Sequence, residues 1–350
     1  MKKPIVVLTA PTLQGNGAER VVLTLAKGLA QQGCEVHIIL TLKNIVELES
    51  DGQFQIHYFK QYYRWIPKSI RGRVLAPLLD RFIVKNCSSE PDLVLSNLEP
   101  SDIMLCHSKF NTYLIIHSAM SEMIDCFKRD KIEQSKIYTK KPVICVSKGV
   151  KEDFDKIFDS QFPSYAIYNS IDVDFIEQKS VEFKPEYGDY LVHVGKFNDA
   201  KRHDILIKAY AKSGIDSHLV LVGQGPLQEA CKALVDELGL NDKVIFVGFQ
   251  SNPYPFIRQA KLMVLSSRFE GFGMVIAEAL ALNTPVISTD CPSGPSEILP
   301  RSNLVPTGDV DALANKIVDA VKSPIEYVVN LKKDFILEYQ AKKYLKLIKR

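Results

Sequence analysis

Two glutamates eight positions apart, Glu270 and Glu278, flank a Gly-Phe-Gly turn in the stretch RFEGFGMVIAEALAL. An apolar run at 262–265 precedes the turn and predicts a buried strand, and the run at 274–282 predicts a helix. A glycine turn between a strand and a helix leaves free backbone N–H groups at the positive end of the helix, and these amides favour a phosphate. The two carboxylates could then meet the groups on either side of that phosphate, such as a sugar and a ribose.

The spacing alone carries little weight, because a loop glutamate and a solvated helix glutamate often stand eight residues apart. The whole stretch at 262–289, LMVLSSRFEGFGMVIAEALALNTPVIST, resembles the E-x7-E signature of glycosyltransferase family 4, whose members are retaining enzymes with the GT-B fold. The resemblance implies that Glu270 holds hydroxyls of the donor sugar and that Glu278 holds those of the ribose. It assigns the donor phosphates to the turn itself, Gly271, Phe272, Gly273 and Met274.

Size and composition set the class of the protein. Its 350 residues suffice for two domains, each with its own core. A hydrophobic content of 46%, a charged content of 24% and a net charge of +3 are ordinary for a globular α/β protein and give no general affinity for nucleic acid. The seven cysteines are scattered without a C-x-x-C pair, which favours reduced, buried thiols over a zinc site. We therefore expect a cytoplasmic protein without a zinc site. The family resemblance further implies an enzyme that requires no metal and no cofactor beyond its donor substrate.

A glycine loop follows the first expected strand and opens a βαβ unit of a parallel sheet. The expected strand, loop, helix and second strand lie at residues 5–8, 14–17, 18–32 and 35–40. The apolar run at 5–10 is too short for a signal peptide or a membrane span. A dinucleotide fingerprint is an alternative, but its third glycine is missing. The stretch NGAERVVLTLAKGLAQQGCEVHII resembles the opening of the same family, which implies that Gly15 and Gly17 let the backbone approach the donor phosphates or the acceptor.

Further loops resemble the donor site of the family. The strand expected at 190–194 runs into GKFNDAKR, which resembles the VGR-x4-K loop whose two cations clamp the donor diphosphate. Lys196 stands where arginine is usual and supplies a charge without the bidentate fork, while Lys201 fills the second position. The alternative is a pair of solvated loop lysines. The glycine turns after the strands at 219–222 and 244–249 complete the implied nucleotide contacts, which are Gly195, Gly223, Gly248, Phe249 and Gln250.

A histidine closes the strand expected at 112–117. His117 resembles the family position at which a histidine lies beside the donor sugar, and the resemblance implies that it orients the sugar. The alternative is a histidine of the core, and His107 is a rival in a poorer context. Asp172 and Asp174 could be mistaken for a D-x-D metal motif, but we expect them to form a turn and a helix cap.

Residues 57–85 combine seven cations with one acid and interleave aromatic side chains. This mixture fits a surface that docks on an anionic membrane or on a phosphorylated saccharide. A pair of solvated helices with a buried apolar stripe fits equally well. Nucleic acid is disfavoured because charge is balanced in the rest of the chain. The basic residues 325–350 are expected to be helical and to add to the membrane-facing charge.

The resemblance implies two Rossmann-like α/β domains facing across a cleft, with a C-terminal helix that crosses back to the first domain. We expect an acceptor domain at 1–168, completed by the helix at 330–350, and a nucleotide-sugar domain at 169–329. The function implied is retaining transfer of a hexose or N-acetylhexosamine from a UDP-sugar, with N-acetylglucosamine placed narrowly ahead of galactose and glucose. The acceptor would be a glycolipid or oligosaccharide of a growing bacterial cell-surface glycan, such as lipopolysaccharide or lipooligosaccharide core.

The resemblance also implies a place of action, the inner face of the cytoplasmic membrane, where the protein would make peripheral contact with anionic lipid. Two other functions stay open at this point. One is another activity on the same fold, such as UDP-sugar epimerisation, and the other is a catalytically silent subunit that only binds a nucleotide sugar.

Overall fold

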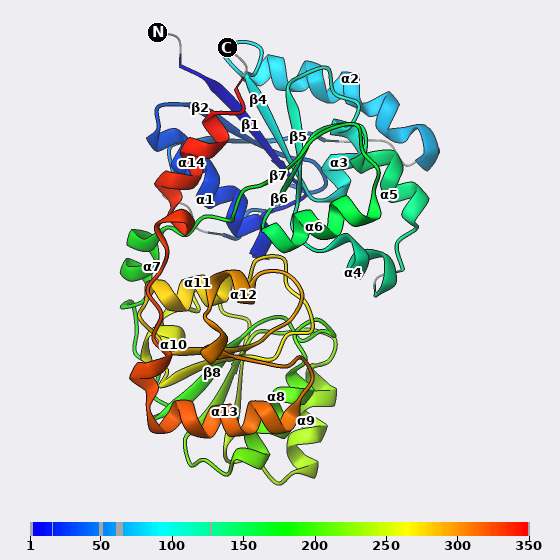
Figure 1. Cartoon of the computed structure of the whole chain (residues 1–350). Coiled ribbons are helices and arrows are strands. Elements are labelled where there is room, and N and C mark those ends of the chain that lie inside the picture. The colour runs from blue at the N-terminus through cyan, green and yellow to red at the C-terminus, as the bar shows by residue number, and fades with distance from the viewer. Residues whose placement is uncertain (1–2, 16, 49–51, 61–65, 127, 349–350) are drawn as a thin grey trace. The chain divides into compact units, whose positions relative to one another are not determined.

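The computed structural model describes residues 3–15, 17–48, 52–60, 66–126 and 128–348 (Figure 1). The chain divides into two compact units. The first unit combines residues 1–170 with residues 333–350, and the second comprises residues 171–332. Each unit is built on one parallel sheet with helices packed against it.

The sheet of the first unit has seven strands in the order β3-β2-β1-β4-β5-β6-β7, and all neighbouring strands are parallel. The central strands are buried apolar runs, as expected for a sheet that is covered on both faces. The strands are β1 (Ile5–Ala10), β2 (Glu35–Leu40), β3 (Gln55–Tyr58), β4 (Leu93–Asn97), β5 (Thr112–Ile116), β6 (Val143–Cys145) and β7 (Ser164–Ala166).

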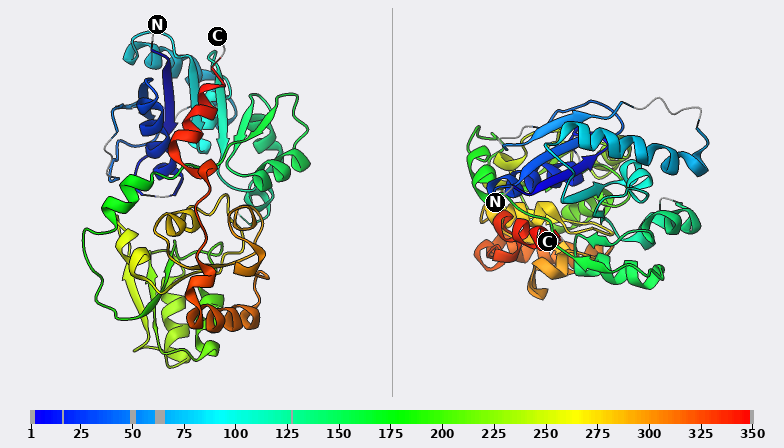
Figure 2. Two further views of the ribbon diagram at one scale, coloured as in Figure 1. Left: turned by 60° about the vertical axis from the view of Figure 1, so that its left-hand side comes forward. Right: turned by 90° about the horizontal axis from the view of Figure 1, so that it is seen from above.

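The helices of the first unit include one from the C-terminal part of the chain. Helix α14 packs on α1, and the two lie side by side in Figures 1 and 2. Gly28 of α1 permits this approach, because a Cβ there would lie 2.3 Å from Cδ1 of Leu337. The helices are α1 (Gly17–Gln31), α2 (Lys68–Asn86), α3 (Glu99–Leu105), α4 (Met120–Asp125), α5 (Lys131–Tyr138), α6 (Lys148–Ile157) and α14 (Leu337–Leu345).

The returning C-terminal helix is confirmed, but the expectation of a helix throughout 325–350 is wrong. Short 3-10 turns occupy Pro324–Tyr327 and Lys333–Phe335, and the residues between them form no helix or strand. The physical reason is that the chain passes here from the second unit to the first, so these residues connect two cores rather than cover one. Phe335 fixes the start of the returning segment on the first unit by packing edge-on against Tyr168, with ring centroids 5.1 Å apart.

The sheet of the second unit has six strands in the order β10-β9-β8-β11-β12-β13. The chain runs outward from β8 to β10 and then returns to the other side of β8, which creates a switch point between β8 and β11. In open α/β sheets, ligands bind beyond the carboxyl ends of the strands at such a point. The strands are β8 (Tyr190–Val194), β9 (His218–Val222), β10 (Val244–Gly248), β11 (Leu262–Leu265), β12 (Val286–Thr289) and β13 (Leu304–Val305).

Two groups of helices pack in the second unit. Helix α8 contacts both α9 and α13 in one group, and α7, α10 and α11 contact one another in the other. The core between the sheet and the first group is apolar and includes Leu191, Phe197, Leu206, Leu221 and Ile317. The helices are α7 (Val173–Lys179), α8 (His203–Ser213), α9 (Gln228–Glu237), α10 (Tyr254–Gln259), α11 (Met274–Ala281), α12 (Pro295–Ile298) and α13 (Val310–Lys322).

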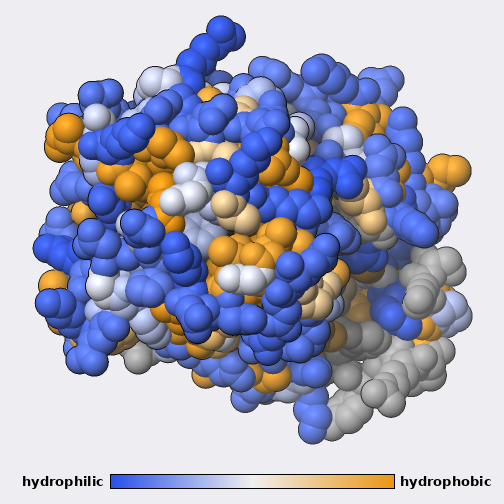
Figure 3. Space-filling model, turned by 90° about the horizontal axis from the view of Figure 1, so that it is seen from below, coloured by the Kyte–Doolittle hydropathy of each residue, from blue (hydrophilic) through white to orange (hydrophobic). Residues whose placement is uncertain are grey.

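Hydrophilic side chains dominate the face seen in Figure 3, and apolar side chains occur there in separate groups. Within the described ranges, no helix combines the length and the apolarity that crossing a bilayer requires. Five of the seven cysteines are buried and none of them forms a disulfide, which confirms the expectation of reduced, mostly buried thiols.

Candidate functional site

The loops that follow β8 and β11 meet at the switch point of the second unit. The backbone N–H of Arg268 donates to the carbonyl of Ala200 at 2.7 Å, and the hydroxyl of Ser266 donates to the carbonyl of Lys201 at 2.8 Å. These bonds join the two loops because neighbouring parallel strands end at the same edge of the sheet. Lys201 and Glu270, which belong to separate motifs in the sequence, are thereby brought together.

An ion pair between Lys201 and Glu270 lies at the centre of this site. Nζ of Lys201 is 2.5 Å from Oε1 of Glu270, and the hydroxyl of Ser267 donates to the same oxygen at 2.7 Å. The hydroxyl of Thr289 in β12 in turn donates to the carbonyl of Ser267 at 2.6 Å. Glu270 is only 9% exposed. A charge-assisted pair at low exposure, held by further hydrogen bonds, fixes both side chains at the sheet edge.

Lys196 differs from Lys201 although both belong to the same loop. Its side chain is exposed and, in the part of the chain that the structure describes, its ammonium forms no hydrogen bond or ion pair. The loop backbone beside it is fixed, because Phe197 is fully buried and its N–H donates to the carbonyl of Gln224. Of the two lysines in this loop, Lys196 is thus available to a ligand, whereas Lys201 is already paired with a carboxylate.

The glycine turn and helix α11 supply backbone donors to the same edge. Gly273 caps α11 with a left-handed backbone (φ 90°), a conformation that favours glycine. The first-turn N–H groups of α11, at Met274 and Val275, have no acceptor within the helix, and the helix dipole makes this end positive. The helix expected at 274–282 is confirmed as Met274–Ala281.

Phe272 of the turn is buried, with 2% exposure, so its side chain belongs to the core and only its backbone can meet a ligand. The loop before α12 packs on it closely, since a Cβ at Gly294 would lie 2.2 Å from the carbonyl oxygen of Phe272. Glu278 lies one helical turn after Met274 on α11 and is 5% exposed. A carboxylate buried in this mostly apolar helix is a sign of function, because glutamates are rarely buried in a protein interior.

Three glycines that the sequence assigned to nucleotide contact lie together at the ends of β8, β9 and β10. A Cβ at Gly223 would lie 2.0 Å from the carbonyl oxygen of Gly195, and the N–H of Gly223 donates to the carbonyl of Gly248 at 2.8 Å. Glycine is thus needed here for close backbone packing. Phe249 is exposed and Gln250 partly exposed directly after β10, so both side chains are accessible at this edge.

Two buried histidines behind the lysine loop were missed by sequence reasoning. Nδ1 of His193 lies 2.8 Å from the carbonyl oxygen of Val264, and the ring of His203 stacks on Phe197 with centroids 3.9 Å apart. Burial lowers the pKa of His193 to about 4 and that of His203 to about 2, so both rings are neutral at physiological pH. A histidine in a strand otherwise made of apolar residues was the available signal for His193.

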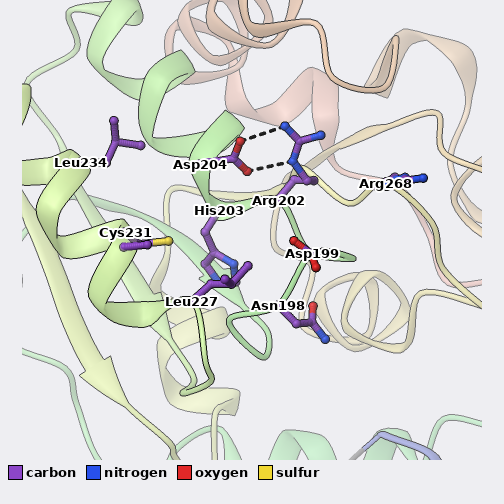
Figure 4. Close-up of a pocket in the computed structure, with 10 residues that line it drawn as sticks. Asn198, Asp199, Arg202, His203, Asp204, Leu227, Cys231, Leu234 and Arg268 are labelled. Carbon is purple, nitrogen blue, oxygen red and sulfur yellow. Dashed lines mark hydrogen bonds and ion pairs between the residues drawn. The ribbon is translucent and has the colours of Figure 1, made fainter. Parts of the chain in front are cut away.

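A cavity of about 330 Å³ lies beside the lysine loop (Figure 4). Arg202 donates two hydrogen bonds to Asp204 there, at 2.9 and 2.8 Å. The positive and negative side chains that line the cavity balance, so the cavity has no clear preference for an anion or a cation. The lining residues are Asn198, Asp199, Arg202, His203, Asp204, Leu227, Ala230, Cys231, Leu234 and Arg268.

His117 of the first unit lies at the end of β5, next to the end of β4. Its Nε2 is 2.9 Å from Oδ1 of Asn97, so Nε2–H donates and Nδ1 remains an acceptor. Desolvation of the ring lowers the pKa of His117 to about 4, which keeps the imidazole neutral. Asn97 had no role in the sequence interpretation. The rival His107 follows α3, before β5 begins, and Nζ of Lys140 lies 3.2 Å from its Nε2.

The glycine loop after β1 is organised by Glu19 of α1, which is 1% exposed. Its carboxylate accepts hydrogen bonds from the N–H of Gly15 at 2.9 Å and from the hydroxyl of Thr12 at 2.5 Å. Gly17 begins α1, and among the described residues beyond its chain neighbours and its own helix, none has an atom within 4 Å of the position that a Cβ would take there. The loop therefore has a fixed backbone at Gly15 and open space at Gly17.

Two further sequence predictions concern the cap at Asp172 and the 57–85 stretch. The helix cap at Asp172 is confirmed, because its side chain accepts a hydrogen bond from the N–H of Phe175 at the start of α7. Part of the 57–85 stretch, residues 61–65 with Arg64 and Trp65, lies outside the described residues. The helix α2 within that stretch is described from Lys68.

Comparison with known proteins is consistent with this architecture. Residues 15–175 match the family described as "Glycosyltransferase Family 4", and residues 174–342 match "Glycosyl transferases group 1". A Campylobacter jejuni protein named N-acetylgalactosamine-N,N'-diacetylbacillosaminyl-diphospho-undecaprenol 4-alpha-N-acetylgalactosaminyltransferase is 33% identical over 82% of this chain and 81% of its own length. The lipopolysaccharide 1,6-galactosyltransferase of Salmonella typhimurium is 29% identical over 53% of each chain.

Solved structures share the fold at low sequence identity. The Anabaena protein HepE, solved in complex with UDP and glucose, superposes with a TM-score of 0.68 at 16% identity, over 99% of this chain and 95% of its own. A glycosyltransferase from Rickettsia africae superposes with a TM-score of 0.72 at 17% identity over the whole of both chains. Together with the two parallel sheets and the returning α14, these likenesses identify the GT-B fold that the sequence implied.

Proposed function

This chain belongs to glycosyltransferase family 4, and from that premise we propose that it moves a hexose or N-acetylhexosamine from a UDP-sugar to a lipid-linked glycan of the bacterial cell surface. The observation that carries the proposal is the meeting of Lys201, Glu270 and the start of α11 at one sheet edge. Cations and helix amides suit a diphosphate, and a carboxylate beside them suits the hydroxyls of a sugar.

The donor would bind mainly to the second unit. In this arrangement the diphosphate rests on Lys196, Lys201 and the first-turn amides of α11. Glu270 holds hydroxyls of the sugar and Glu278 those of the ribose. The accessible edge after β10, at Gly248, Phe249 and Gln250, would face the uracil. The UDP complex of the structurally similar HepE supports the choice of UDP.

The proposed reaction breaks the bond between the anomeric carbon and the β-phosphate oxygen. The acceptor hydroxyl forms the new bond on the same face of the sugar, and its proton passes to the departing diphosphate. Negative charge builds on the β-phosphate as the bond breaks, and Lys196, Lys201 and the α11 amides stabilise that charge. This chemistry uses cations of the protein where other transferases use a metal ion.

The acceptor would enter from the first unit. His117 is neutral and fixed by Asn97, so its free Nδ1 can accept a hydrogen bond from a sugar hydroxyl. The glycine loop at Gly15 and Gly17 would bring backbone groups to the donor phosphates or to the acceptor.

An N-acetylhexosamine is the sugar that we favour, since the Campylobacter relative is named for transfer of N-acetylgalactosamine. The name of that relative also includes diphospho-undecaprenol, a lipid carrier, which supports a glycolipid as the acceptor of this chain. With such an acceptor, the protein would work at the inner face of the cytoplasmic membrane as a peripheral protein.

The test is a panel of UDP-sugars offered with glycolipid from strains that make truncated surface glycans, with the products read by mass. UDP-N-acetylglucosamine, UDP-N-acetylgalactosamine, UDP-glucose and UDP-galactose would be compared. We expect one N-acetylhexosamine to be added with release of UDP, and the Glu270→Ala variant to lose transfer while it still binds UDP.

Three other results would contradict the proposal. Conversion of a free UDP-sugar without acceptor would indicate an epimerase. Binding of UDP-sugars without turnover on any lipid extract would indicate a silent subunit. Transfer that requires a divalent cation and survives loss of Lys201 would contradict the proposed charge stabilisation.

A further inference from the structure

Helix α2 has an inner face that is fixed on the first unit. A Cβ at Gly72 would lie 2.1 Å from the carbonyl oxygen of Ile103, so only glycine lets α2 approach α3 this closely. Asp80 is buried, and its two oxygens accept hydrogen bonds from the hydroxyl of Ser108 at 2.7 Å and the N–H of Lys109 at 3.0 Å. These contacts determine which face of α2 points away from the unit.

The opposite face of α2 presents an apolar stripe to solvent. Ile70, Val74 and Leu78 are 45%, 41% and 47% exposed, and Val84 is 37% exposed. The spacing of four residues places the first three on one side of the helix, because each lies only about 40° around the axis from the one before it. The inner residues Leu75, Ala76, Leu79 and Ile83 are buried, so α2 is apolar on both its faces.

Cations accompany the apolar stripe. Arg73, Arg81 and Lys85 are exposed on the same side of α2. Asp80 is the one acidic residue within the helix sequence, and it is buried in hydrogen bonds on the inner face. The outer face of α2 is therefore apolar and positive, without a compensating acid of its own. From Ile70 to Lys85 it extends for roughly 22 Å along the helix at 1.5 Å per residue.

We propose that this face of α2, defined by Ile70, Val74, Leu78 and Val84 with Arg73, Arg81 and Lys85, docks the protein on the surface of an anionic lipid bilayer. The apolar side chains would enter the boundary between headgroups and acyl chains, and the cations would contact lipid phosphates. The inference rests on the proposed glycolipid acceptor, which a bilayer would present at the same surface.

Charge complementarity selects the bilayer as the occupant. A helix packed into a protein groove needs a partner shaped to one set of side chains, whereas a fluid anionic surface accommodates four aliphatic side chains and three long cations in any order. The aliphatic side chains also argue against nucleic acid, which favours aromatic stacking beside its phosphate contacts.

The experiment measures binding of the full chain to vesicles by sedimentation, with pure phosphatidylcholine compared against phosphatidylcholine containing phosphatidylglycerol. One test variant combines Arg73→Gln, Arg81→Gln and Lys85→Gln. A second combines Ile70→Gln, Val74→Gln and Leu78→Gln, which keeps good helix formers on α2.

Each test variant has a control matched in the number and the charge of the substituted side chains. The charge control combines Lys184→Gln, Lys208→Gln and Lys322→Gln, all of which are exposed in the second unit. The apolar control combines Val181→Gln, Leu238→Gln and Ile325→Gln, whose side chains are 66%, 39% and 79% exposed. Circular dichroism and transfer to a water-soluble acceptor fragment verify that every variant is folded and active.

We expect the native chain to bind anionic vesicles and not neutral ones, and each test variant to lose about tenfold or more in partitioning. The controls should bind like the native chain. Native binding to neither vesicle, equal loss in the controls, or undiminished binding of the test variants would overturn the inference. Because the soluble acceptor reports transfer separately, such a failure leaves the proposed enzymatic function standing.

Discussion

Nζ of Lys201 lies 2.5 Å from Oε1 of Glu270, although 69 positions separate the two residues in the sequence. A diphosphate that contacts Lys201 must therefore compete with Glu270 for the same ammonium. When the diphosphate replaces Glu270 as the partner of Lys201, the carboxylate of Glu270 would become available to sugar hydroxyls. Donor binding and orientation of Glu270 would then be coupled.

Substitution Glu270→Gln tests this competition. Glutamine keeps the size of the side chain but removes the charge that holds Lys201, so affinity for UDP should rise by roughly threefold to tenfold. Transfer should fall by about 100-fold or more, because the sugar loses its carboxylate. Calorimetric titration with UDP and a transfer assay measure the two effects.

Glu278→Gln is the matched control for Glu270→Gln. Glu278 is a second glutamate with low exposure, and it is assigned to the ribose rather than to Lys201. Its neutralisation should weaken UDP binding several-fold. If both substitutions weaken UDP binding alike, Glu270 does not compete for Lys201.

The unpaired cation Lys196 makes a separate prediction. Lys196→Ala should weaken UDP binding about tenfold at low salt and less at high salt, since exposed charges are screened. Protein stability should not change, because the side chain has no partner among the described residues. Lys196→Arg should bind UDP at least as well as the native chain, as a fork suits a phosphate.

Lys208→Ala serves as the control for Lys196, because Lys208 is an exposed lysine of α8. It should leave UDP binding unchanged. Equal effects of the two alanine substitutions would mean that only the overall charge of the second unit matters.

Much of the donor side was predictable from the sequence because its signals are local. The strand at 262–265, the glycine turn and α11 follow one another along the chain, and each element carries its own pattern. Lys201 and Glu270 could be assigned to motifs, but their contact could not, since it depends on the return of β11 to the side of β8. The spacing of residues along the chain does not reveal the order of strands in the sheet, so it could not predict that β11 lies beside β8.

The first unit was less predictable for a different reason. Asn97 supports His117 across two neighbouring strand ends, and an asparagine after an apolar run is also typical of an ordinary turn. The short edge strands β3 and β7 were missed because their residues are only partly buried and show no clear alternation. The end of the chain was mistaken for a long helix because its composition is rich in helix formers on both sides of the crossing.

The bond between His117 and Asn97 predicts a change in pH dependence. Asn97→Asp keeps an acceptor for Nε2–H but adds a negative charge, which should raise the pKa of His117 from about 4 towards or above its ordinary value. Only the neutral ring is proposed to accept a hydrogen bond from a sugar hydroxyl. The fall in transfer activity on the acidic side of the pH profile should therefore occur at a higher pH in the variant than in the native enzyme.

Asn97→Ala complements that substitution, because it removes the acceptor without adding charge. Transfer should fall by about tenfold while the pH profile stays in place. Pre-steady-state transfer rates over pH 4 to 8 measure both variants. An unmoved profile in Asn97→Asp would show that the protonation state of His117 does not matter.

His203 predicts a loss of stability in acid. Its pKa in the folded protein is about 2, against an ordinary value near 6.5, so the unfolded chain takes up a proton that the folded protein refuses. The histidine has no effect on stability above its unfolded pKa and becomes destabilising as pH falls below it. Between roughly pH 6 and pH 4, His203 contributes at most about 1.4 kcal/mol per pH unit to the slope of the free energy of unfolding against pH.

The variant His203→Phe should keep the stacking on Phe197 and remove this share of the pH dependence. Urea unfolding at several pH values, compared between the native chain and the variant, measures the difference. Parallel pH profiles for the two proteins would rule out the proposed contribution of His203.

Gly223 predicts a sharp steric effect at the donor edge. Its φ is 146° and an added Cβ would lie 2.0 Å from the carbonyl oxygen of Gly195, so Gly223→Ala must shift backbone. We expect a loss of about 2–4 kcal/mol in the free energy of unfolding. Gly214→Ala is the control, since its φ is 62° but its Cβ would meet nothing within 4 Å, and it should cost about 1 kcal/mol.

The most direct test of the account is a crystal structure of this protein with UDP bound. The account predicts that the diphosphate oxygens contact Lys196, Lys201 and the first-turn amides of α11, with Lys201 moved away from Glu270. A diphosphate bound elsewhere, or a Lys201–Glu270 pair left intact beside it, would contradict the account.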